Sequence, residues 1–130
     1  MLDAYAAAAV FEEQSAESIT LIAASNGTTT AMDHAVEAQA AGWPAPRAMV
    51  WMSPGSYTES QHRVAELGMA DVLECFPTAA ARWSTQAAGK APEGESWTLH
   101  EYDPGSHGTG LFASAPEVAD DIVERLAAVP

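Results

Sequence analysis

Basic side chains are scarce in this chain of 130 residues, which has five lysines and arginines against 18 aspartates and glutamates. The formal net charge is −13 at pH 7. A field of this sign repels nucleic acid and anionic membrane surfaces, so we expect neither as a partner. It favours a neutral or cationic small molecule as the ligand.

Cysteine is almost absent as well. The single Cys75 excludes an internal disulfide and a cysteine-rich metal site, and a lone cysteine within a strand is expected in the core. A chain without disulfides suits a reducing interior, so we expect a cytoplasmic location. No apolar run approaches the roughly 20 residues of a membrane span, and the first residues lack the basic charge of a signal peptide. The sequence also indicates no cofactor.

Apolar residues make up 48% of the chain, which is enough for one domain with its own core over residues 1–130. Short apolar runs alternate with helix-forming stretches. The pattern predicts strands over 19–24, 47–53, 71–76 and 97–102, and helices over 3–14, 28–41, 58–68, 78–90 and 116–128. This alternation is typical of an α/β fold with a parallel sheet, whose functional residues lie beyond the carboxyl ends of the strands.

The most informative segment surrounds Ser25, at the end of the first apolar run. It reads Ala-Ala-Ser-Asn-Gly over 23–27 and is followed by a helix-forming stretch. This is the nucleophile-elbow pattern with alanine in place of the first glycine, and it predicts an exposed, nucleophilic serine. The simpler interpretation is that Ser25 is only a helix N-cap.

A second informative segment is the glycine-rich loop after the last predicted strand. It reads Asp-Pro-Gly-Ser-His-Gly-Thr over 103–109. Such a loop can carry His107 across the edge of the sheet. The order of serine first and histidine last is the order of the catalytic residues in α/β-hydrolases.

The elbow, the Met-Ser-Pro-Gly strand end at 52–55 and the loop at His107 together resemble the C-terminal half of an α/β-hydrolase. The dienelactone-hydrolase-like enzymes and small esterases are the nearest kinds, and the resemblance runs from about Leu2 to Val129. It implies a partial α/β-hydrolase fold with about four parallel strands and flanking helices. It also implies Ser25 as nucleophile, His107 as general base and the Asn26 N–H as oxyanion donor. The expected activity is weak, broad hydrolysis of small neutral carboxylesters through an acyl-enzyme.

Two departures from that family affect the predicted site. The segment after the third strand reads Phe-Pro-Thr-Ala-Ala-Ala-Arg over 76–82 and lacks the aspartate that the family carries there. We take Asp103, on the histidine's own loop, as the candidate acid, with Glu74 as the alternative. The strands that precede the elbow in the family, and the early loop with its second oxyanion donor, are not matched. We therefore expect the exposed edge of the 19–24 strand to form a homodimer that completes the sheet.

Other interpretations remain open at this stage. The chain could be a non-catalytic remnant of a hydrolase that serves as an assembly or binding module. It could also be a metal-assisted hydrolase that uses His100, Asp103 and His107, with Glu101 between them in sequence. We expect Cys75 not to be a nucleophile, and we expect Asp33 and His34 to lie on a solvated helix face.

Overall fold

The computed structural model describes residues 2–43, 46–54, 63–64, 66–67, 71–89 and 96–129. Its strands are β1 (Thr20–Ala24), β2 (Ala48–Met52), β3 (Asp71–Pro77) and β4 (Ser96–Tyr102). Its helices are α1 (Leu2–Glu13), α2 (Gly27–Ala40), α3 (Ala81–Ala88), α4 (Leu111–Ser114) and α5 (Glu117–Ala128), with short 3₁₀ turns η2 (Thr78–Ala80) and η3 (Gly108–Gly110). The helix expected over 58–68 falls mostly outside the described residues; within it, 63–64 and 66–67 are 3₁₀.

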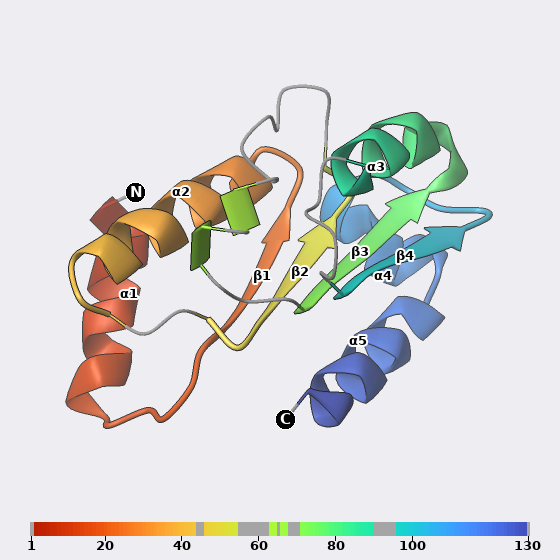
Figure 1. Ribbon diagram of the computed structural model, residues 1–130. Coiled ribbons are helices and arrows are strands. Elements are labelled where there is room, and N and C mark those ends of the chain that lie inside the picture. Colours follow the sequence, from red (N-terminus) through yellow and green to blue (C-terminus); the bar gives the residue numbers. More distant parts are fainter. Residues whose placement is uncertain are drawn as a thin grey trace.

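The strands form one four-stranded sheet in the order β1-β2-β3-β4, and every neighbouring pair is parallel. Sequence order and spatial order coincide because each crossover returns the chain to the next position along the sheet. The predicted parallel α/β architecture is therefore confirmed. All strands finish at the same end of the sheet, toward which the arrows point in Figure 1.

Alternate residues of each strand supply separate hydrophobic clusters on the two faces of the sheet. On one face, Met49 and Trp51 of β2 pack with Met32 of α2. On the other face, Val50 and Met52 pack with residues of α4 and α5. Both clusters are closed to solvent, so the sheet has a helical layer on each side (Figure 1).

β1 lies at one edge of the sheet and is poorly covered on the α5 side. Ile22, at the centre of β1, is 53% exposed, and Val123 of α5 is 68% exposed. On the opposite side α1 lies against α2, and a pocket of about 250 Å³, lined by mostly apolar residues and His34, lies between α1 and β1. None of the helices in the described ranges is long and apolar enough to cross a membrane.

Candidate active site

Ser25 occupies a sharp turn between β1 and α2. Its φ of +52° is in the left-handed region, which costs a residue other than glycine about 1–3 kcal/mol. The surrounding backbone holds this conformation. The Ser25 N–H donates to the carbonyl of Met52 at 2.9 Å, and the N–H and Oγ1–H of Thr28 donate to the Ser25 carbonyl at 3.1 and 2.7 Å. The strand–turn–helix context predicted from the sequence is confirmed.

His107 reaches the same place from the far edge of the sheet. A Cβ on Gly105 would lie 2.9 Å from the Cβ of Pro77, so only glycine lets the loop lie this close to the end of β3. A Cβ on Gly108, whose φ is +60°, would lie 3.8–3.9 Å from the side chains of Ala24 and Ser25. The loop after β4 thus crosses the ends of β3 and β2 and arrives at the end of β1.

The crossing places the imidazole of His107 against the hydroxyl of Ser25. His107 Nε2 and Ser25 Oγ are 2.8 Å apart, which is hydrogen-bond distance between residues 82 positions apart in the chain. When Nε2 is unprotonated it accepts the Ser25 proton, as a general base must. The N-cap position of α2 belongs to Asn26, so the N-cap interpretation of Ser25 is not what the structure has.

Asn26 follows the serine with its backbone N–H at the start of α2. Among the described residues, this N–H has no acceptor. The first N–H groups of a helix carry partial positive charge and are oriented toward the elbow. The geometry is therefore compatible with the predicted role of the Asn26 N–H as an oxyanion donor.

The structure connects neither candidate carboxylate to His107. Asp103 is exposed, and no hydrogen bond or ion pair joins it to His107 among the described residues. Glu74 is fully buried, and its Oε2 accepts a hydrogen bond from Trp97 Nε1 at 2.9 Å. Burial raises the pKa of Glu74. The identity of the acid therefore stays a prediction.

The two histidines considered for metal binding, His100 and His107, contact different residues. His100 Nδ1 lies 3.6 Å from Asp121 Oδ2 of α5, whereas His107 contacts Ser25. In the parts of the chain that the structure covers, no three histidine, cysteine, aspartate or glutamate side chains are grouped to hold a metal ion. The hydroxyl of Tyr102 donates to Asp121 at 2.7 Å, so His100 and Tyr102 share a face, as expected for alternate residues of a strand.

Cys75 is buried at the centre of the sheet, as expected. It is a free thiol, and burial raises its pKa to about 11. A thiol protonated at neutral pH and closed to solvent is a poor nucleophile. Cys75 thus packs in the hydrophobic core of the sheet.

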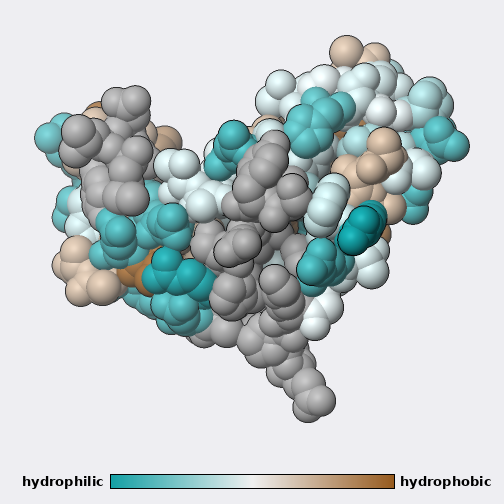
Figure 2. Space-filling view, turned by 90° about the horizontal axis from the view of Figure 1, so that it is seen from above, coloured by the Kyte–Doolittle hydropathy of each residue, from teal (hydrophilic) through white to brown (hydrophobic). Residues whose placement is uncertain are grey.

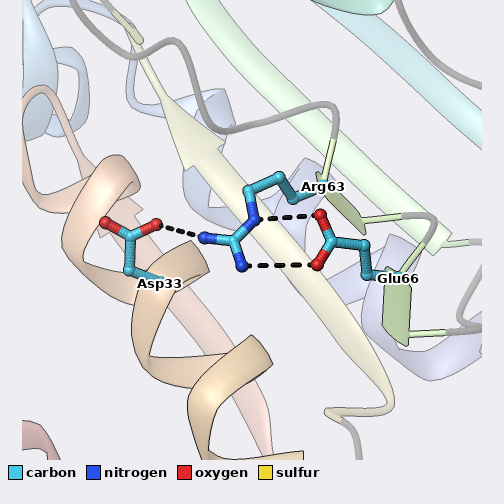
Figure 3. Close-up of polar contacts among 3 residues, drawn as sticks. All are labelled: Asp33, Arg63 and Glu66. Carbon is cyan, nitrogen blue, oxygen red and sulfur yellow. Dashed lines mark hydrogen bonds and ion pairs between the residues drawn. The ribbon is translucent and has the colours of Figure 1, made fainter.

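The expectation of a solvated helix face was wrong for His34, whereas the Asp33 side chain is partly exposed. His34 is buried, and burial lowers its pKa. Asp33 accepts a hydrogen bond at 2.9 Å from the guanidinium of Arg63. The same guanidinium donates two hydrogen bonds to the carboxylate of Glu66 (Figure 3). The contact between Asp33 and Arg63 joins α2 to a segment 30 residues away, so a local sequence pattern could not reveal it.

Sequence analysis also missed a residue at the neighbouring strand end. Ser53 follows β2 as Ser25 follows β1, and its φ is +50°. Its side chain is fully buried, and among the described residues its Oγ has no hydrogen-bond partner. The available signal was the Ser-Pro-Gly sequence directly after a buried strand.

The surface at this end of the molecule is seen from above in Figure 2. The described residues there are mostly hydrophilic or of intermediate hydropathy, with smaller hydrophobic areas. Comparison of the chain with protein-family models, curated proteins and solved structures found no match.

Proposed function

We propose that this chain is a small serine carboxylester hydrolase with weak, broad activity toward neutral esters. The observation that carries the proposal is the 2.8 Å contact between Ser25 Oγ and His107 Nε2. It occurs at a serine held in the left-handed conformation, at the carboxyl end of a parallel strand. Backbone strain of this kind is concentrated at functional sites.

The reaction would proceed through an acyl-enzyme. Ser25 Oγ adds to the ester carbonyl carbon while its proton passes to His107 Nε2. The oxyanion that forms accepts a hydrogen bond from the Asn26 N–H. Collapse of this intermediate breaks the bond to the alcohol oxygen, which takes the proton from His107. Water then adds to the acyl carbon by the same proton route and releases the carboxylic acid and free Ser25.

The rate is expected to be modest for two reasons. No carboxylate contacts His107 among the described residues, and replacing the acid of such a triad with its amide costs about 10⁴ in turnover in a well-studied protease. Asn26 is the one oxyanion donor identified among the described residues, and losing one donor of such a pair costs about 10²–10³ in turnover. Activated or short esters therefore suit the site best.

Hydrolysis of p-nitrophenyl acetate tests the proposal. We expect turnover by the wild type and only the uncatalysed rate with Ser25→Ala. Ser25→Gly is the matched control, because glycine adopts the φ of +52° without strain and also lacks the hydroxyl. Wild-type turnover by either folded variant would remove Ser25 from the mechanism.

We further propose that two copies pair through the free edge of β1 in the cytoplasm. Among the described residues no strand pairs with the outer edge of β1, and Ile22 on the same strand has an exposed apolar side chain. A two-fold axis beside β1 would pair this strand antiparallel with its symmetry mate and join the four-stranded sheets of the two copies into one. Ser25 follows β1 directly and would therefore lie near the seam.

A second candidate function is that of a non-catalytic remnant kept as an assembly or binding module. The absence of a carboxylate contact at His107 within the described residues favours this alternative. The two candidates predict opposite results in the ester assay. Ester turnover that depends on the Ser25 hydroxyl is expected only if the protein is a hydrolase.

A further inference from the structure

We propose that Ser53 is a positioning residue for His107, accepting the Nδ1–H of the imidazole in place of a carboxylate. This inference rests on the proposed hydrolase function and assigns the missing partner in that site. The Ser53 hydroxyl is buried and has no hydrogen-bond partner among the described residues.

Ser53 is placed beneath the path of the histidine. The loop touches the end of β3 at Gly105 and the side chain of Ser25 at Gly108. β2 lies between β3 and β1 in the sheet. Ser106 and His107 must therefore pass over the end of β2, and Ser53 is the residue at that end.

Ser53 also stands beside Ser25 in the sheet. Ala24 and Met52 are register partners, so the next residues, Ser25 and Ser53, leave adjacent strands at the same level. Their φ values are +52° and +50°. Strands in a sheet are about 4.8 Å apart, which brings Ser53 within reach of a ring that already contacts Ser25.

No contact among the described residues explains why the hydroxyl of Ser53 is buried. Its backbone N–H continues the ladder by donating to the Cys75 carbonyl at 2.7 Å. Its Oγ is closed to solvent and, among the described residues, unpartnered. A buried hydroxyl without a hydrogen bond is costly, and such groups call for an explanation.

His107 needs such an acceptor. For Nε2 to accept the Ser25 proton, the ring proton must sit on Nδ1, and the partner of Nδ1 selects that tautomer. The structure shows no hydrogen bond between Ser53 Oγ and His107. Catalytic hydrogen bonds are often long without substrate and shorten in the reacting complex. Ser53 Oγ accepts a hydrogen bond from the Nδ1–H of His107, and the hydroxyl proton of Ser53 can point to a different acceptor.

Two variants test the role without straining the backbone. Ser53→Gly removes the hydroxyl at a φ of +50° that glycine accepts freely. Ser53→Asn keeps an acceptor oxygen, and asparagine tolerates the same region. We expect Ser53→Gly to lower kcat for p-nitrophenyl acetate roughly tenfold, the effect of one lost hydrogen bond, with little change in KM. Ser53→Asn should recover most of that loss.

The tautomer of His107 gives a readout that does not depend on activity. ¹⁵N NMR of the imidazole, assigned by its loss in His107→Gln, should show less of the Nδ1–H form in Ser53→Gly than in the wild type. An unchanged tautomer in Ser53→Gly would overturn the proposal, as would an unchanged kcat in an active enzyme. If the wild type has no esterase activity but the tautomer shifts, Ser53 keeps its positioning role and the hydrolase function alone fails.

Discussion

Glu74 of β3, whose side chain is fully buried, accepts a hydrogen bond at 2.9 Å from the indole of the partly buried Trp97 on β4. Strand register pairs Val72 with Trp97 and Glu74 with Leu99, so the bond runs diagonally between residues on one face of the sheet. The Glu74 carboxyl is buried in the folded protein and exposed to water in the unfolded chain. Its protonation is therefore linked to folding.

The first prediction concerns stability as a function of pH. Burial raises the pKa of Glu74 in the folded state, so the folded protein holds this proton more tightly than the unfolded chain. The stabilisation is complete below the unfolded pKa of about 4.3 and is lost as pH rises through the folded value. Glu74→Gln removes this dependence. In thermal unfolding we expect the Tm difference, variant minus wild type, to increase from pH 4 to pH 8.

Glu101→Gln is the matched control for that measurement, because Glu101 lies on the same strand as Trp97 but is exposed. Its Tm difference from the wild type should stay flat over the same pH range. A flat difference for Glu74→Gln as well would contradict the assignment of Glu74 as a buried, folding-linked carboxyl.

The second prediction separates the two candidate acids. Asp103 is on the loop of His107, and its charge favours the imidazolium that forms during acylation. Because Asp103 is exposed and screened by salt, we expect Asp103→Asn to lower kcat only several-fold. Glu74→Gln should leave kcat within about twofold, since its carboxyl contacts Trp97. Equal, negligible effects would show that neither carboxylate assists the histidine.

The third prediction is the pH dependence of turnover. His107 must be neutral to accept the Ser25 proton, because both ring nitrogens of a protonated imidazole are donors. We expect kcat/KM for p-nitrophenyl acetate to be lost at acid pH and to reach a plateau at alkaline pH. A profile that stays flat from pH 5 to pH 9, or full activity in His107→Ala, would argue against a histidine base.

The fourth prediction concerns assembly. Ile22→Lys places a charge at the centre of the exposed β1 edge and should convert a dimer into a monomer. Light scattering at low micromolar concentration should give twice the chain mass of 13.6 kDa for the wild type. Glu101→Lys, on the opposite edge strand, should remain dimeric. A wild-type protein that is active at 13.6 kDa would contradict the proposed pairing.

Much of this architecture could be predicted because its signals are local. Apolar runs predicted all four parallel strands to within one or two residues. The small residues around Ser25 identified the elbow, and the glycines around His107 identified a loop able to cross the sheet. At Gly105 the structure supplies the reason, since a side chain there would collide with Pro77.

What the sequence could not predict depends on contacts between distant segments. His34 was placed on the surface as part of the Asp33–His34 pair, yet it is buried and lines a pocket with residues of α1 and β1. α4 was missed because the Gly-Thr-Gly of η3 directly before it has low helix propensity, and α4 is held by the packing of Leu111 in the core. The left-handed φ of Ser53 likewise leaves no trace in composition.

The central claim is that Ser25 is a nucleophile activated by His107, and covalent labelling tests it most directly. Incubation with a fluorophosphonate ester should transfer one phosphonyl group to the protein, with loss of fluoride. Peptide mass spectrometry should locate the group on Ser25, and His107→Ala should slow its transfer by orders of magnitude. Failure to label the folded wild type, or equal labelling of Ser25→Ala, would contradict the account.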